Sequence, residues 1–172
     1  MNTMIFDTET SGLPKSYKAS PSDVGAWPRI VEIAWVIVDE AQNRVSASEF
    51  IIRPDGFQIS PGASPVHGMT TQKAQSEGRP LRYVMACFAE DLSDVSHLVA
   101  HNIDFDFPVV NCELLRSSVS AGCSVEQLLD AQPFVAAGRN WTLAKAEQLI
   151  LKDATPTSWV ALQIGNRSEG LF

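Results

Sequence analysis

The residues from Ile30 to Val38 form a long apolar run that only Glu32 interrupts. A run of this length favours a buried strand at the centre of a sheet. Residues 3–7 and 45–53 also have strand character, and after residue 80 helical and extended segments alternate. Three consecutive strands followed by such alternation predict an α/β fold, a mixed sheet with helices on its faces.

The second half of the chain carries the helical signals. Pro80 can open a helix, and apolar residues repeat at helical spacing through Leu92. A short strand near residue 97 leads into a helix that we expect to end near Ser118, with Pro108 in its first turn because proline is tolerated there. The remaining expected elements are a short strand over Ser124–Leu129 and a helix over Trp141–Leu151.

Length and composition indicate one soluble domain over residues 1–172. The hydrophobic share of 45% and the charged share of 19% are ordinary for a globular protein. No apolar run approaches the roughly 20 residues of a membrane span, and Met1-Asn2-Thr3 lacks the basic region of a secretory signal. Three cysteines without metal-binding spacing fit a reducing compartment. We therefore expect a cytoplasmic protein with no membrane partner.

The net charge of −7 limits the ways in which this chain can bind nucleic acid. Broad, non-specific binding requires a basic surface, which the composition does not supply. A small binding site remains compatible with this net charge, because metal cations at the site would offset an acidic cluster. Lys15, Lys18 and Arg29 could contact phosphates at such a site, but ordinary surface charges are the simpler interpretation of each.

Two carboxylates, Asp7 and Glu9, directly follow the apolar residues 4–6. Strand side chains alternate, so the two carboxylates point the same way if the extended conformation continues. At the end of a buried strand they would repel each other and lose hydration. A divalent cation would remove that cost, and hard cations prefer carboxylate oxygens. A solvated strand end would carry the same residues, so spacing alone leaves both interpretations open.

A second acidic segment occupies residues 97–110, where a short apolar strand leads into a helix. Asn102 and Asp104 are favourable N-cap residues. Asp106 would then lie near the positive end of a helix, which favours an ionised carboxylate. Asp104 would point elsewhere, because helical residues two apart do not share a face.

These segments together resemble the DEDD, or DnaQ-like, family of exonucleases. Residues Phe6–Leu13 resemble the first motif of that family, and His101–Asp106 resemble its second. Between them, Val66–Thr70 resembles the recurring His-Gly-Ile-Thr segment of the family. Leu128–Asp130 and then Trp141–Ala144 fall where the family has an aspartate-bearing strand followed by a helix. The resemblance covers most of the chain.

The resemblance implies a ribonuclease H-like fold, a mixed five-stranded sheet flanked by helices. It also implies metal-dependent hydrolysis at the 3′ end of DNA or RNA, by a two-metal mechanism with Mg²⁺ or Mn²⁺. The catalytic residues and metal ligands would be Asp7, Glu9 and Asp106. Asp7 would bridge both ions, Glu9 would bind one and orient the water, and Asp106 would support the second.

The same correspondence assigns substrate binding to Thr10, Leu13, His67 and Asn102. Leu13 occupies the position that the family packs against the terminal base. His67 would hold the loop on the substrate side, although a turn histidine is equally consistent. The partner implied is the 3′ end of a nucleic acid; homo-oligomer formation and a polymerase or repair partner are left open.

The third motif of the family, a helix with a histidine and an aspartate five residues later, is absent or degenerate. The matching positions hold Trp159 and Ile164, so residues 155–172 are atypical. Loss of a general base typically costs roughly 10²–10⁴ in rate. We therefore expect impaired exonuclease activity with a weakly bound second ion. The alternatives are a catalytically inactive exonuclease-fold domain that binds nucleic acid or a protein partner, and an active protein whose C-terminal region is altered here.

Glu32 is the one charged residue in the central apolar run. Metal ligation would explain a carboxylate at this position. A glutamate that is hydrogen-bonded or exposed at a sheet edge is the simpler expectation, because an unpaired buried charge is costly.

Overall fold

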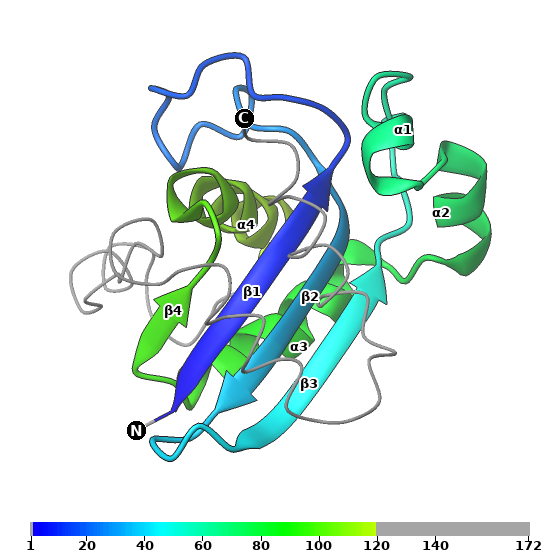
Figure 1. Cartoon of the computed structure of the whole chain (residues 1–172). Coiled ribbons are helices and arrows are strands. Elements are labelled where there is room, and N and C mark those ends of the chain that lie inside the picture. The colour runs from blue at the N-terminus through cyan, green and yellow to red at the C-terminus, as the bar shows by residue number, and fades with distance from the viewer. Residues whose placement is uncertain (1, 120–172) are drawn as a thin grey trace.

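The computed structural model describes residues 2–119 of the chain. Four strands form one sheet in the order β3-β2-β1-β4: β1 (Thr3–Thr10), β2 (Ile30–Val38), β3 (Arg44–Ile51) and β4 (His97–Val99). The β1–β2 and β2–β3 pairs are antiparallel, whereas β4 runs parallel to β1 (Figure 1). The expected mixed sheet is confirmed. The strand and helix expected over Ser124–Leu129 and Trp141–Leu151 lie outside the described residues.

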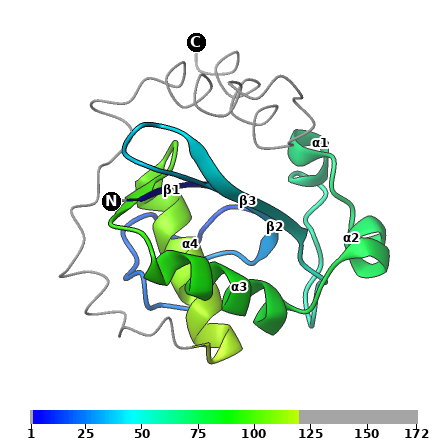
Figure 2. The same ribbon diagram turned by 90° about the horizontal axis from the view of Figure 1, so that it is seen from below.

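Two long helices, α3 (Leu81–Ser93) and α4 (Ile103–Ser117), pack on the same face of this sheet (Figure 2). Phe88 of α3 lies between two buried aromatic residues of the sheet, with ring centroids 5.8 Å from Phe6 and 5.2 Å from Trp35, both edge to face. Such pairs add roughly 0.5–1.5 kcal/mol beyond the burial of their area. None of the helices in residues 2–119 is long and apolar enough to cross a membrane.

The segment between β3 and α3 contains two short helices, α1 (Ser64–His67) and α2 (Thr71–Glu77). A left-handed Gly68, with φ of 72°, ends α1, a conformation that glycine adopts without strain. Thr70 then caps α2, its side chain accepting a hydrogen bond from the backbone amide of Lys73. These turns carry His67 to the end of the sheet where β1 stops.

The expected position of Pro108 in a first helical turn is wrong. The helix α4 begins at Ile103, after Asn102 at the N-cap, so Pro108 lies inside the helix. A proline there removes the bond to the carbonyl four residues earlier, at Asp104. Asp104 is exposed, so water can satisfy that carbonyl, and the buried residues that follow Pro108 hold the helix on the sheet.

Candidate active site at the end of strand β1

One edge of strand β1 pairs with a neighbouring strand along only the first part of its length. Its first part is an interior strand, because Thr3, Met4 and Ile5 pair with β4. Beyond Ile5 the strand β4 has ended, and the chain turns into α4. The backbone groups on that side of β1 are therefore available to the first turn of the helix. Ligand sites of α/β sheets commonly form where chain segments diverge in this way at the carboxyl ends of strands.

Asp106, in the first turn of α4, occupies this edge. One of its oxygens, Oδ1, accepts hydrogen bonds from the Thr8 amide at 3.2 Å and from the Thr8 hydroxyl at 2.7 Å. The Asp106 side chain is fully buried. The positive end of the helix favours the ionised carboxylate. The second-motif aspartate and the first-motif strand are thus joined directly by hydrogen bonds.

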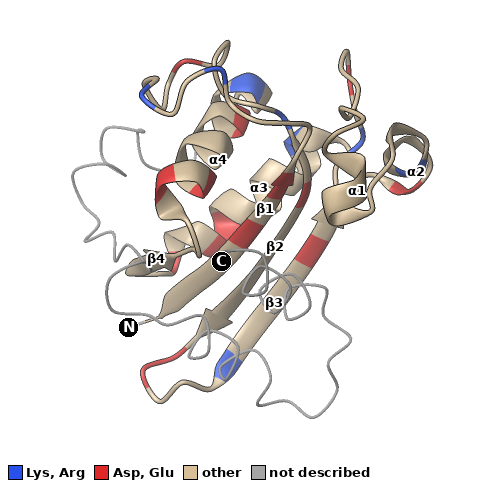
Figure 3. Cartoon of the chain, turned by 45° about the horizontal axis from the view of Figure 1, so that its top comes forward, with Lys and Arg blue, Asp and Glu red and all other residues tan. Residues whose placement is uncertain are grey.

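Asp7 and Glu9 lie on the opposite face of β1 from Thr8, because side chains of a strand alternate. Glu9 is directly opposite Glu32 of β2, and Asp7 is opposite Ala34. Ala34 in turn pairs with Glu49 of β3. Directly opposed residues share a face, so four carboxylates gather on one side of three adjacent strands. Figure 3 marks acidic positions on β1 and β3 in red.

The expected position of Glu32 at a sheet edge is wrong, and within the described part of the chain one of its two carboxylate oxygens lacks the hydrogen bond that the other expectation would supply. It lies in an interior strand with 3% of its surface exposed, and its Oε2 atom has no hydrogen-bond partner within residues 2–119. Burial, together with the charges of Glu49, Glu9 and Asp7, raises the pKa of Glu32 to about 8, against the opposing charge of Lys73. Negative charge is therefore costly on this face.

A cavity of about 610 Å³ opens next to Glu9 at the end of β1; we refer to it as the terminal cavity. All four residues predicted to bind substrate line it: Thr10, Leu13, His67 and Asn102. Thr8 and Glu9 line it as well, whereas Asp7 and Asp106 are not in its wall. Residues of both motifs and of the His67 segment therefore meet in the wall of one cavity.

The polar residues of the terminal cavity are held in different ways. The Thr10 hydroxyl donates to the Gly12 carbonyl at 2.7 Å and shapes the turn after β1. The Nδ1 atom of His67 accepts the Met69 amide at 3.1 Å, which fixes the ring. Asn102 is the N-cap residue of α4, yet its side chain makes no capping hydrogen bond. The Asn102 amide can therefore serve a ligand in the cavity.

The apolar part of the wall was missed by sequence reasoning, apart from Leu13. Leu13 and Val66 are 79% and 78% exposed, and Tyr17 is 62% exposed. The Tyr17 ring lies 6.4 Å from that of Phe105, centroid to centroid. Phe105 could have been found from its place beside Asp106 in the second motif, but Tyr17 lies in a polar loop that gives no such signal.

The carboxylates at this end of β1 fit a hard divalent cation in donor type and in burial. Asp7, Glu9 and Asp106 are each at most 4% exposed, and the raised pKa of Glu32 shows that further negative charge is unfavourable there. Within the described part of the chain, however, no three carboxylate, histidine or cysteine side chains converge closely enough to form a complete metal site. The third-motif positions, 159 and 164, lie outside the described residues.

Comparison with protein families gives one result for this chain. The family model RNase T, described as an exonuclease family, matches residues 4–131 and so covers most of the sequence. The matched range contains every residue to which a catalytic, metal-binding or substrate-binding role was assigned above. No protein of curated description matches the sequence significantly.

Solved structures with a similar fold include several of exonuclease I. The E. coli enzyme in complex with a dT13 oligonucleotide has a TM-score of 0.56 and 22% identity, over 70% of this chain and 25% of that one. A zinc-bound E. coli complex with single-stranded DNA gives 0.57 and 22%, over 70% and 24%. Exonuclease I from Methylocaldum szegediense gives 0.58 and 22%, over 70% and 24%. The matched region is thus about a quarter of each of those chains, and the likeness establishes a shared fold.

Proposed function

Because the chain belongs to the exonuclease family that the RNase T model describes, we propose that it hydrolyses phosphodiester bonds at the 3′ end of a nucleic-acid strand with Mg²⁺ or Mn²⁺. The observation that supports this most is the terminal cavity. Its wall combines polar groups beside buried carboxylates with exposed apolar side chains. A terminal nucleotide requires both, since its phosphate is charged and its base is flat and largely apolar.

The apolar side of the cavity would hold the terminal base. Leu13 and Val66 offer exposed aliphatic surface, while Tyr17 and Phe105 offer rings. Stacking of a base on an aromatic ring is worth roughly 1–3 kcal/mol and tolerates any sequence. A base can enter only if it leaves its neighbours in the strand, so a single-stranded end should be preferred to a paired one.

The acidic side would hold the reacting phosphate through cations. Asp7, Glu9 and Asp106 would be the metal ligands, and Thr8 would be a positioning residue because its amide and hydroxyl fix Asp106. When bound, a divalent cation supplies a more acidic water and stabilises charge on the leaving oxygen. The Asn102 amide lies in the same wall and would hydrogen-bond the terminal nucleotide.

One observation favours a second candidate, a domain that binds a 3′ end without turnover. The positions that match the third motif hold Trp159 and Ile164 in place of the histidine and the aspartate. Such a domain would keep the terminal cavity and its affinity for a strand end. Turnover under metal therefore decides between the two candidates.

The test uses the full chain and single-stranded oligo(dT), a choice motivated by the oligonucleotide bound to E. coli exonuclease I. We expect mononucleotides to be released from the 3′ end, faster with Mn²⁺ than with Mg²⁺, because an incomplete ligand set suits a less demanding ion. EDTA should stop the reaction. Strands labelled at one end or the other report the direction.

The matched variants are Asp7→Ala and Asp23→Ala, each of which removes one aspartate. Asp23 lies in an exposed loop, where its carboxylate accepts a hydrogen bond from the Gly25 amide. Asp7→Ala should remove hydrolysis and Asp23→Ala should leave it unchanged. Release from the 5′ end, or activity that survives Asp7→Ala, would contradict the proposed function.

A further inference from the structure

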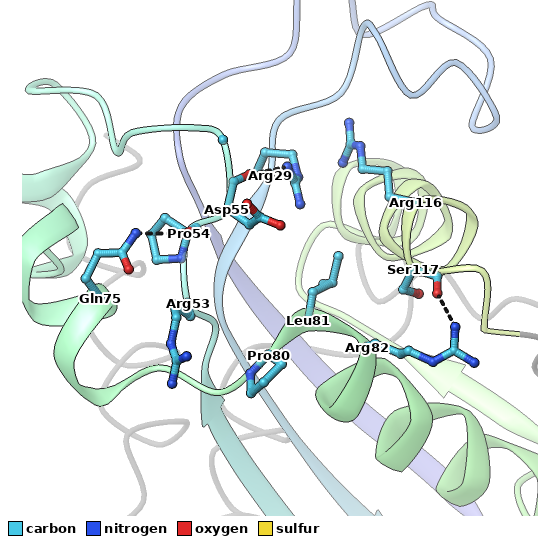
Figure 4. A pocket seen from close by; sticks show the side chains of 11 residues that line it. Arg29, Arg53, Pro54, Asp55, Gln75, Pro80, Leu81, Arg82, Arg116 and Ser117 are labelled. Carbon is cyan, nitrogen blue, oxygen red and sulfur yellow. Dashed lines mark hydrogen bonds between the residues drawn. The ribbon is translucent and has the colours of Figure 1, made fainter.

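A second cavity, of about 910 Å³, lies on the helix side of the molecule, and four arginines from four separate segments line it. Arg29 precedes β2, Arg53 follows β3, Arg82 is in the first turn of α3 and Arg116 is in the last turn of α4. Figure 4 shows these side chains around Leu81. We refer to this cavity as the arginine pocket. It concentrates four of the 13 basic residues of an acidic chain.

Two of the four arginines are fixed by the protein itself. Glu113 is fully buried, and its Oε1 atom contacts Arg29 Nε at 2.8 Å and Arg116 Nη1 at 3.1 Å. The same oxygen accepts the Ile30 amide at 3.0 Å. The Arg29 guanidinium also lies 4.5 Å above the Phe57 ring. These two side chains therefore form a rigid part of the wall.

The other two arginines have weaker attachments. Arg53 donates to the Gly78 carbonyl at 3.1 Å and Arg82 to the Ser117 carbonyl at 3.4 Å. Both side chains are exposed, and within residues 2–119 neither forms an ion pair with a carboxylate. Among residues 2–119, the four arginines of the pocket wall are accompanied by two carboxylates, the lining Asp55 and the buried Glu113, which leaves an excess of two positive charges.

Phosphate is the anion that this arrangement suits. Guanidinium groups present several donors in one plane and bind phosphate oxygens more specifically than point charges do. The first turn of α3, a helix of 13 residues, lines the same pocket and adds the positive end of its dipole. The volume lies within the range of roughly 300–1,000 Å³ typical of ligand sites.

The arginine pocket adjoins the terminal cavity through a short hydrogen-bonded junction at Ser11. The Ser11 amide donates to the Arg29 carbonyl at 2.8 Å, and the Arg29 amide donates to the Ser11 hydroxyl at 3.1 Å. On its other side, the Ser11 carbonyl accepts the Ser60 amide at 3.0 Å. Arg29 lines the arginine pocket and Ser60 lines the terminal cavity. A nucleic-acid strand, which carries one phosphate per nucleotide, suits two adjacent sites on the two sides of Ser11.

We propose that the arginine pocket binds the backbone phosphates of a nucleic-acid strand at a distance from the end held in the terminal cavity, with Arg53 and Arg82 as the phosphate contacts. The choice of a strand as ligand rests on the proposed function. The pocket itself does not take part in hydrolysis. It would give long strands more affinity than short ones, without sequence preference, because phosphate contacts position a strand but do not read bases.

The test measures binding of 5′-labelled oligo(dT) to the full chain in EDTA, using a dinucleotide and a strand of about a dozen nucleotides. The variants are Arg53→Gln and Arg82→Gln. Arg44→Gln is the charge-matched control, since Arg44 is exposed at the start of β3, at the other end of the sheet. Thermal melts confirm that each variant is folded.

For each pocket variant we expect severalfold weaker binding of the long strand and unchanged binding of the dinucleotide. The slope of log Kd against log salt should fall by about 0.7, the value for one phosphate contact of a single strand. Salt slopes equal to that of Arg44→Gln would overturn the proposal. So would loss of inorganic phosphate binding with strand binding unchanged, or equal displacement of the strand by a polyglutamate peptide.

This design separates the two proposals. If no condition gives hydrolysis but the length dependence still requires Arg53 and Arg82, the proposed function fails and the arginine pocket stands. If hydrolysis requires Asp7 but the pocket variants bind every strand as tightly as the wild type does, the proposed function stands and the proposal for the arginine pocket fails.

Discussion

The terminal cavity and the arginine pocket are separated by the Ser11 junction, yet they obtain positive charge in different ways. The terminal cavity adjoins buried carboxylates, and no lysine or arginine among residues 2–119 lines it, so we expect its phosphate contacts to be made through bound metal cations. The arginine pocket carries its cations on its own side chains, two of them fixed by Glu113. A chain with a net charge of −7 can therefore still contact a polyanion, because four of its 13 basic residues are gathered where no metal is needed.

The strongest test of this difference removes the carboxylate that organises the arginine pocket. Glu113→Gln should lower the free energy of unfolding by about 3 kcal/mol, because breaking a buried ion pair leaves uncompensated charge. It should also tighten binding of a long strand, since one negative charge is lost. Denaturant titrations measure the first effect. Glu90→Gln, which removes an exposed carboxylate of α3, is the control and should change neither.

Hydrolysis at the terminal cavity should become faster if the histidine and the aspartate of the third motif are supplied. Trp159→His with Ile164→Asp should raise the rate of 3′ hydrolysis by roughly 10² or more, the range expected for restoring a general base. The two changes should be strongly non-additive, because they act as a unit. Single-turnover rates of both single variants and the double variant measure this. A folded double variant without any gain would mean that positions 159 and 164 do not match the third motif.

Metal should stabilise the protein through only one of the two regions. A ligand that binds only the folded state adds about 2.7 kcal/mol at a hundredfold excess over its Kd. Thermal melts with Mn²⁺ and with EDTA should therefore differ for the wild type and for Arg82→Gln. Asp7→Asn should abolish the difference. Equal melting temperatures in Mn²⁺ and EDTA for the wild type would argue against cations at the carboxylates.

The smallest expected effect concerns pH and Glu32. Its pKa in the folded protein is about 8, above the ordinary value of 4.5, so the folded state binds more protons than the unfolded state between these values. The free energy of unfolding therefore falls as pH rises through this window. In EDTA, Glu32→Gln should raise the Tm at pH 8 by more than about 2 °C and change it little at pH 4.5. Parallel curves of Tm against pH for the wild type and the variant would contradict the raised pKa of Glu32.

Much of the fold could be predicted because its signals are local. The apolar run gave β2 its observed limits, and helical spacing after Pro80 matched α3 closely. The strand β1 extends to Thr10, beyond the apolar residues, because its long antiparallel partner continues to pair with it. The predicted position of Pro108, in the first turn of a helix, was wrong because the start of α4 depends on where β4 ends. The end of β4 is set by its pairing with β1 in the sheet.

The sequence predicted those residues of the site that lie at the ends of strands and helices. Thr10 and Asn102 meet in the terminal cavity because β1 ends there and α4 begins there. The strand of Glu32 was expected to be buried, but the missing partner of Glu32 Oε2 within residues 2–119 could not be foreseen, because it depends on the side chains that the flanking strands place beside it. The arginine pocket gave no sequence signal either, since Arg53 and Arg82 come together only when α3 packs on the sheet.

The divided edge of β1 has a consequence for hydrogen exchange. Most amides of a sheet are protected by a carbonyl of the neighbouring strand, but the Thr8 amide is protected by the Asp106 carboxylate of a helix. Its exchange with deuterium therefore depends on the charge and position of one side chain. Amide exchange at Thr8 should report the state of the second-motif aspartate directly, even in a variant that carries out no reaction.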